Sequence, residues 1–301
     1  MNPLRLQGLF FCLVACFSIA FCAWSPRFDA STELVVVGLL IALLGVPHGA
    51  FDAVFAGDLY GLKTRWSWLV FVLLYVGLAL LVVVFWWLVP MYFLLGFLGV
   101  SAWHFSGDLQ APTSRLGRVV YGGAPLIFPA LLHEPEVTRL FSYLVSQSAA
   151  QGLARGLSDV SLAWLFAAGL ALVRCLRSDP WASLEIGCVS ALALLTPPLM
   201  SFTIFFCFMH SPRHMIRTHR YAGLPTRQLV GRAALPMVAV AGGSGVAWCY
   251  LNGTPLDARV VQVVFVGLAA LTAPHMVLVE QIRHLGWLKL SRPSQDSDHY
   301  L

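Results

Sequence analysis

Residues 66–89 read WSWLVFVLLYVGLALLVVVFWWLV and contain no charged side chain. A helix rises about 1.5 Å per residue, so an apolar run of this length crosses the roughly 30 Å hydrocarbon core of a bilayer. Lys63 and Arg65 stand just before the run. The stretch therefore predicts a transmembrane helix with basic side chains at its first end.

The composition of the whole chain agrees with this prediction. Only 11% of the 301 residues are charged and 58% are hydrophobic, whereas a soluble domain carries roughly 25% charged residues. The net charge of +5 comes without a basic stripe of interleaved aromatic side chains, so nucleic-acid binding is not indicated. The seven cysteines form no CxxC pair and are interpreted as small buried side chains rather than as a disulfide framework.

Hydropathy predicts an all-α bundle of ten transmembrane helices that form one domain over residues 1–301. The predicted spans are 4–23, 33–55, 66–89, 91–105, 119–132, 160–173, 183–196, 199–214, 233–251 and 260–282. The first span is interpreted as an uncleaved helix, because Phe21 occupies the small-residue position of a signal-peptide cleavage site. Residues 133–159 are expected to form the longest polar connection, and residues 284–301 a short cytoplasmic tail.

The fifth predicted span is the least regular. It contains Gly122, Gly123, Pro125 and Pro129, which indicate a kinked or re-entrant segment rather than a straight helix.

The distribution of Lys and Arg orients these spans. With the N-terminus in the cytoplasm, fifteen of the 19 basic residues fall on the inside, and only Arg27, Arg139, Arg155 and Arg259 fall on the outside. Cytoplasmic loops are enriched in Lys and Arg. We therefore expect a multi-pass protein of the inner (plasma) membrane with both termini in the cytoplasm.

Five of the nine histidines lie in apolar segments, namely His48, His104, His210, His214 and His275. Ionisable groups at membrane depth are costly, and by default they indicate a functional site. All five are on even-numbered predicted spans, each roughly 17–23 Å from the start of its span at about 1.5 Å per residue. The sequence therefore predicts that four helices bring these side chains to one layer in the cytoplasmic half of the membrane.

The spacing within this set indicates a metal site. His210 and His214 are four residues apart, which places both imidazoles on one helix face where they can share a metal ion. Asp52 and Asp108 each follow a histidine by four residues, and we expect each carboxylate to orient the preceding imidazole; helix capping or direct ligation are the alternatives. Imidazole suits iron, zinc, copper and nickel, so spacing alone does not identify the metal.

Aromatic side chains surround the same layer. If the metal site is catalytic, we expect some of them to line an apolar substrate tunnel, and the candidates are Phe51, Tyr92, Trp103, Phe105 and Phe206. Helix packing and lipid contact are the simpler interpretation for most of these side chains.

Three motifs resemble the Brp/Blh family of membrane β-carotene 15,15′-dioxygenases. They are Gly45-Val46-Pro47-His48-Gly49-Ala50-Phe51-Asp52, Trp103-His104-Phe105-Ser106-Gly107-Asp108 and Phe208-Met209-His210-Ser211-Pro212-Arg213-His214, and Pro274-His275-Met276 also fits. The resemblance extends from residue 45 to about residue 280.

This resemblance implies a non-haem iron enzyme. It implies Fe(II) held by His48, His104, His210 and His214. His275 matches a further family position, and we place it with Asp52 and Asp108 among the residues that support the site. The implied reaction is the cleavage of the central double bond of β-carotene by O₂ to two molecules of retinal within the lipid bilayer. The resemblance further implies that the retinal is delivered to a rhodopsin.

Three other classes of protein remain as alternatives. A metal transporter would use histidines along a translocation path, and an accessory protein would bind a carotenoid or retinal without catalysis. A zinc-dependent membrane hydrolase would need a glutamate base beside the histidine pair, where this chain has Ser211.

Overall fold

The computed structural model describes residues 2–24, 29–109 and 113–285. In chain order the helices are α1 (Pro3–Trp24), α2 (Ala30–Leu40), η1 (Ile41–Gly45), η2 (Val46–Phe51), α3 (Asp52–Tyr60), α4 (Arg65–Leu88), α5 (Pro90–Ser106), α6 (Arg115–Ile127), α7 (Pro129–Ser142), α8 (Gln147–Ser178), α9 (Pro180–Leu195), α10 (Pro198–Phe205), η3 (Phe206–His210), α11 (Ser211–Ala222), α12 (Thr226–Tyr250), α13 (Leu256–Val261), η4 (Gln262–Val266) and α14 (Gly267–Leu285). No β-strand occurs in the described ranges, which confirms the predicted all-α class.

Within the described residues, six helical runs are long and apolar enough to cross a membrane. They are Pro3–Trp24, Ser31–Tyr60, Arg65–Leu88, Gln147–Ser178, Thr226–Tyr250 and Leu256–Ile282. Four further predicted spans, 91–105, 119–132, 183–196 and 199–214, correspond to α5, α6 with the start of α7, α9, and α10 with η3 and α11. The count of ten spans and the cytoplasmic side of both termini therefore stay predictions.

The expected polar connection over residues 133–159 is wrong, because nearly all of it is helical. It belongs to α7 and to the first turns of α8, which begins at Gln147. Ala130, Val137 and Ala154 form a small buried cluster between these two helices. This apolar contact stabilises the packing of α7 on the first turns of α8, whose outer faces are polar. Mean hydropathy does not predict such helices, because their polar faces lower the average. The predicted kink in 119–132 is present, because α6 ends at Ile127 and a new helix begins at Pro129.

Three of the helical runs contain a wide, π-helical turn. These turns are η1, η3 and η4, and a tight 3₁₀ segment, η2, follows the first of them. Such turns are uncommon and often occur at functional sites, because they re-aim the side chains that follow. Each lies in the run that carries one of the apolar-segment histidines, His48, His210 or His275.

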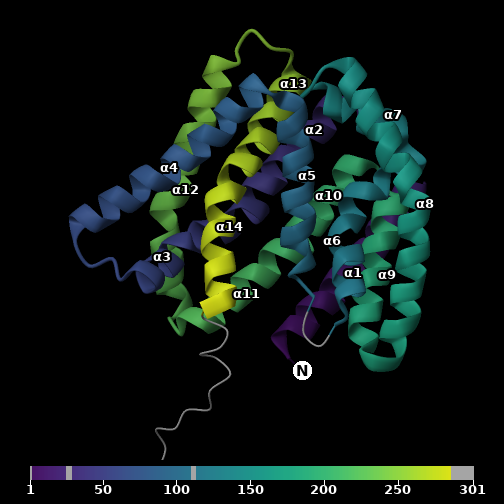
Figure 1. Ribbon diagram of the computed structural model, residues 1–301, viewed down its shortest axis with the longest axis horizontal. Helices are drawn as coiled ribbons and strands as arrows, with labels where there is room; N and C mark the ends of the chain where they lie inside the picture. Colours follow the sequence, from purple (N-terminus) through teal and green to yellow (C-terminus); the bar gives the residue numbers. More distant parts are fainter. Residues whose placement is uncertain (1, 25–28, 110–112, 286–301) are drawn as a thin grey trace, which may run out of the picture.

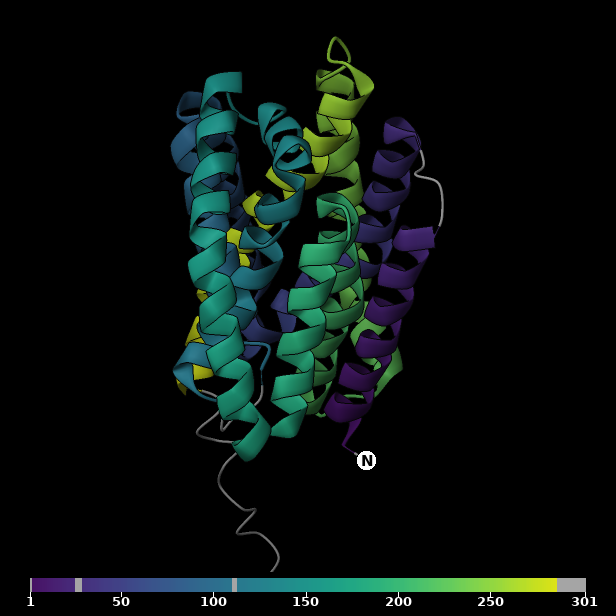
Figure 2. The same ribbon diagram turned by 90° about the vertical axis from the view of Figure 1, so that its right-hand side faces the viewer.

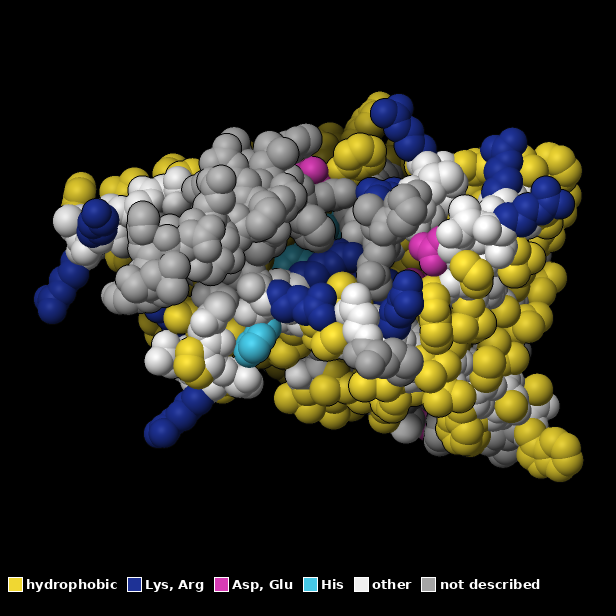
Figure 3. All heavy atoms as spheres, turned by 90° about the horizontal axis from the view of Figure 1, so that it is seen from below, with side chains coloured by type: hydrophobic (Ala, Val, Ile, Leu, Met, Phe, Trp, Pro, Cys, Tyr) yellow, Lys and Arg dark blue, Asp and Glu magenta, His cyan; other side chains and the backbone are white. Residues whose placement is uncertain are grey.

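The helices form a bundle with two ends. The start of α1 and the end of α14 lie at the same end, at the bottom of Figures 1 and 2. Figure 3 looks onto this end and shows Lys and Arg side chains gathered over it, with histidine side chains visible in a hollow between the helices. This distribution agrees with the basic cytoplasmic face that the sequence predicts.

The outer helices differ sharply in burial from the inner ones. α4 buries none of its residues, as expected of a helix whose surroundings are lipid. The main core comprises apolar side chains of α1, α5, α6, α9, α10 and η3, including Phe11, Phe105, Tyr121, Ile186 and Phe205. Phe105 and Phe206 of this core contact the rings of His210 and His48.

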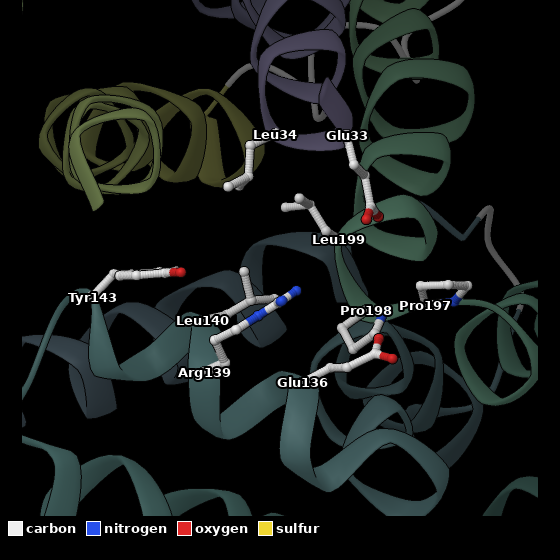
Figure 4. Close-up of a pocket in the computed structure, with 9 residues that line it drawn as sticks. All are labelled: Glu33, Leu34, Glu136, Arg139, Leu140, Tyr143, Pro197, Pro198 and Leu199. Carbon is white, nitrogen blue, oxygen red and sulfur yellow. The ribbon is translucent and has the colours of Figure 1, made fainter. Parts of the chain in front are cut away.

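A small polar pocket lies at the opposite end of the bundle. Figure 4 shows Glu33 of α2 and Glu136, Arg139 and Tyr143 around it, with the start of α10 as one wall. No histidine lines this pocket, so it is separate from the site described below.

Candidate metal centre

The five histidines that the sequence singled out converge in the structure. None of them is more than 9% exposed. The ring centroid of His48 lies 5.0 Å from that of His210, 5.5 Å from that of His214 and 5.3 Å from that of His275. The His104 ring lies 4.6 Å from His210 and 5.1 Å from His275. The prediction that four helical runs surround a common point is thus confirmed.

The ring nitrogens of this cluster have the arrangement of metal ligands. His48, His104 and His275 each place one ring nitrogen so that all three atoms lie within 4.8 Å of one another. Nε2 of His104, of His210 and of His275 is buried without a hydrogen-bond partner among the described residues. A buried polar atom without a partner costs free energy. A cation bound between these nitrogens would remove that cost.

Fixed partners hold the other ring nitrogen of several of these imidazoles. Nδ1 of His48 lies 2.5 Å from the Gly45 carbonyl oxygen. Nδ1 of His210 lies 2.9 Å from Asp108 Oδ2, and Nδ1 of His275 lies 2.7 Å from Asp52 Oδ1. A carbonyl or carboxylate oxygen accepts a hydrogen bond, so Nδ1 carries the hydrogen in each case and Nε2 keeps its lone pair. Metal-binding histidines are commonly oriented in this way.

The two carboxylates contact different histidines from those that the spacing predicts. Asp52 contacts His275 and Asp108 contacts His210, instead of the histidine four residues earlier. The reason is local. His48 lies in the 3₁₀ segment η2, where three residues make a turn and the fourth points elsewhere, and Asp108 lies beyond the end of α5.

The pair His210 and His214 fits its prediction better. Their ring centroids are 6.3 Å apart. Pro212 does not break the helix between them, because it occupies the first turn of α11, where no intrahelical hydrogen bond is lost. Nδ1 of His214 has a more distant contact, 3.4 Å from the Thr218 hydroxyl.

Several groups that support the site were not expected from the sequence. The Tyr75 hydroxyl donates to Asp52 Oδ2 at 2.8 Å, and nothing in its apolar surroundings on α4 indicated this contact. Arg213 and Arg217 donate to the backbone carbonyl of Asp108 at 3.1 and 2.6 Å. These contacts fix the chain segment that carries the carboxylate.

A buried ion pair lies next to this segment. Arg213 is fully buried and donates to both carboxylate oxygens of Glu185, at 2.6 and 2.8 Å. Its Nε donates to the side-chain oxygen of Gln7 at 2.9 Å. Glu185 was not singled out from the sequence, although an acidic residue inside a predicted span is a signal of a buried partner.

An apolar cavity adjoins two of the histidines. His48 and His104 lie on its wall, and its remaining lining residues are Phe97, Ser101, Phe105, Phe202, Phe206, Leu268 and Thr272. Of the five aromatic candidates from the sequence, the structure brings Phe105 and Phe206 to this cavity.

The other three aromatic candidates lie elsewhere. Tyr92 and Trp103 are 68% and 59% exposed and point outward from α5, and Phe51 packs in a separate cluster with Leu229 and Ala233 of α12. Hydropathy predicts the depth of the five aromatic side chains in the membrane, but it does not determine which face of each helix is directed inward.

Comparisons with known proteins point to one family. The family model described as beta-carotene 15,15′-dioxygenase matches residues 39–283. A curated protein named beta-carotene 15,15′-dioxygenase, from an uncultured marine bacterium (66A03), is 32% identical over 257 residues, which cover 81% of this chain and 91% of the relative. No solved structure matches the chain. All five clustered histidines lie within the matched residues.

Proposed function

The chain belongs to the β-carotene 15,15′-dioxygenase family, and we propose that it cleaves the central double bond of β-carotene with O₂ to give two molecules of all-trans-retinal, with Fe(II) as its cofactor. The observation that carries this proposal is the buried histidine cluster on the wall of an aromatic cavity. A long polyene partitions into the bilayer, so an enzyme for it belongs in the plasma membrane as a multi-pass protein.

The histidine cluster fits a metal ion. His48, His104 and His275 would supply ring nitrogens that already lie close together, and His210 and His214 contact the same group of rings. This geometry favours a ligand role for His275 over the supporting role expected from the sequence. Imidazole ligands suit iron, and bound iron would supply the redox chemistry that O₂ needs for reaction with an unactivated double bond.

The surrounding residues hold the imidazoles ready for this task. Asp52, Asp108 and the Gly45 carbonyl keep the hydrogen on Nδ1, so that each Nε2 is directed to the common centre. Tyr75 anchors Asp52 by a hydrogen bond. The two buried carboxylates also add negative charge beside the imidazoles, which a divalent cation would offset.

The cavity lies on the side of the histidines from which we expect the substrate to approach. Phe105 and Phe206 line it together with Phe97 and Phe202, and aromatic faces bind a conjugated hydrocarbon without demanding a charged handle. The overall change consumes one C=C bond and one O₂ and yields two C=O bonds, so no other reactant is required. Holding the polyene in one register against the histidines selects the bond that is cleaved.

The arrangement argues against the metal-transporter alternative. A translocation path needs ligands at several depths, whereas these five imidazoles lie within contact distance of their neighbours. A single compact centre supports a resident cofactor.

The test is expression in bacteria that accumulate β-carotene. We expect loss of orange colour and the appearance of retinal with the intact chain, and unchanged pigment with His210→Ala. The matched control is His133→Ala, because His133 lies on α7 outside the cluster. Unchanged pigment with folded, iron-loaded wild-type protein would contradict the proposed reaction.

A further inference from the structure

Two hydroxyl side chains lie in the otherwise apolar cavity beside the histidines. Ser101 of α5 precedes His104 by three residues, and Thr272 of α14 precedes His275 by three residues. Residues three apart on a helix lie on the same face, one turn from each other. Both hydroxyls line the cavity whose wall includes His48 and His104. They are thus one helical turn from the site of the proposed reaction.

Only one of these hydroxyls has a hydrogen to donate. Thr272 Oγ1 already donates to the Leu268 carbonyl at 2.7 Å. Ser101 is 4% exposed, and its hydroxyl makes no hydrogen bond to another residue in the described part of the chain. A buried hydroxyl without a partner is costly, and a hydrocarbon polyene offers it no acceptor. An oxygen atom that enters the cavity would supply the missing acceptor.

We propose that Ser101 donates a hydrogen bond to the aldehyde oxygen that forms at the cleaved double bond. This inference rests on the proposed function, because that reaction converts an apolar double bond into two carbonyl groups. A donor placed where the oxygen appears stabilises the charge that develops on it, and it does little for the apolar substrate. Ser101 would then stabilise the transition state, in which the carbonyl oxygen forms, more than it stabilises the bound polyene.

The first experiment measures the hydrogen bond itself. All-trans-retinal is added without O₂ to the full-length, iron-loaded protein, and the carbonyl stretch is recorded by infrared spectroscopy. We expect a lowered stretching frequency in the wild type, a higher one in Ser101→Ala, and a frequency close to the wild type in Ser101→Thr, which retains a hydroxyl. Bound retinal with the same frequency in Ser101→Ala and wild type, or no binding to the wild type, would overturn the inference.

Two control variants separate this effect from a general loss of buried hydroxyls. Ser190→Ala removes a buried hydroxyl that also lacks a partner but lies on α9, away from the cavity. Thr272→Val removes a hydroxyl inside the cavity whose hydrogen is already used. Both are expected to leave the carbonyl frequency at its wild-type value. A shift in Thr272→Val as large as that in Ser101→Ala would overturn the assignment of Ser101 as the donor.

The second experiment uses steady-state kinetics with β-carotene. Loss of one neutral hydrogen bond lowers kcat in Ser101→Ala roughly five- to tenfold, while KM and bound iron stay unchanged. Wild-type cleavage with unaltered kcat in Ser101→Ala would overturn the inference and leave the proposed function standing. A wild type that binds retinal with the expected carbonyl shift but cleaves nothing would contradict the proposed function, and aldehyde recognition by Ser101 would stand.

Discussion

At the scale of single residues, the site depends on partners that are far apart in the chain. The Asp52–His275 contact joins residues 223 positions apart, and the Asp108–His210 contact joins residues 102 positions apart. Each carboxylate determines which nitrogen of its imidazole carries the hydrogen, and so which nitrogen is available for a metal. The hydrogen-bond partners of the histidines therefore determine which ring nitrogens are available as metal ligands.

The hydrogen bond between His275 and Asp52 leads to a prediction for His275. His275→Ala should weaken iron binding more than tenfold, because a ligand is removed together with the partner of Asp52. Bound iron per chain and competition with a chelator measure the effect, and His133→Ala serves as control because its Nε2 is also buried without a partner outside the cluster. Wild-type iron affinity in His275→Ala would return His275 to the supporting role expected from sequence.

At the scale of helices, irregular turns and close contacts position the ligands. The π-helical turns η1 and η3 bring Gly45 and Phe206 so close that a Cβ on Gly45 would lie 2.3 Å from Cε1 of Phe206. α5 and α6 approach equally closely, because a Cβ on Gly122 would lie 2.2 Å from the Ala102 carbonyl oxygen. Small residues permit such contacts between membrane helices.

The α5–α6 contact leads to a second prediction. Gly122→Ala should destabilise the protein by about 1–3 kcal/mol, because the backbones of α5 and α6 must separate to admit the methyl group. Thermal unfolding in detergent measures it. Gly99→Ala on α5 is the matched control, since a Cβ there meets nothing within 4 Å. Equal unfolding temperatures for the two variants would contradict the close contact.

At the scale of the whole molecule, one buried network joins distant helices next to the site. Arg213 of α11 contacts Glu185 of α9, Gln7 of α1 and the carbonyl of Asp108 after α5. The Glu185 carboxylate lies so close to α1 that a Cβ on Gly8 would lie 2.2 Å from its Oε1. The network therefore couples the packing of α1 to the position of the Asp108 segment.

Removal of the arginine should be costly. Arg213→Met leaves the Glu185 carboxylate buried without its cation, and we expect a loss of about 3–5 kcal/mol. Arg155→Met should have no measurable effect on unfolding, because the Arg155–Glu134 pair is solvent-exposed, with side chains 74% and 40% accessible. Similar unfolding curves for the two variants would show that the buried network does not stabilise the fold.

The orientation of the molecule in the membrane is a further prediction at this scale. Both ends of the chain are expected in the cytoplasm, so a fluorescent protein fused after Leu301 should fluoresce and alkaline phosphatase at the same point should be inactive. A fusion after Gly253, between α12 and α13, should give the reverse result. Active phosphatase at the C-terminus would contradict the orientation deduced from Lys and Arg.

The class of the fold and the members of the histidine cluster can be predicted from the sequence alone. Apolar runs and the scarcity of charge indicate surrounding lipid directly, because each residue contributes its own free energy of transfer from water to lipid. Histidines in apolar segments stand out for the same reason, and all five clustered imidazoles can be recognised in the sequence. Helix rise converts residue number into depth, and the sequence therefore predicts that these side chains lie in one layer.

The contacts between groups depend on how the helices pack in the folded chain. The partners of Asp52 and Asp108, the inward orientation of Phe105 but not Trp103, and the position of His275 among the ring nitrogens all depend on helix rotation. Each π-helical or 3₁₀ turn changes the direction in which the following side chains point from the helix. Hydropathy does not reveal such turns, because lipid-facing and buried side chains are equally apolar. Packing between helices fixes these angles, and packing is a property of the folded chain.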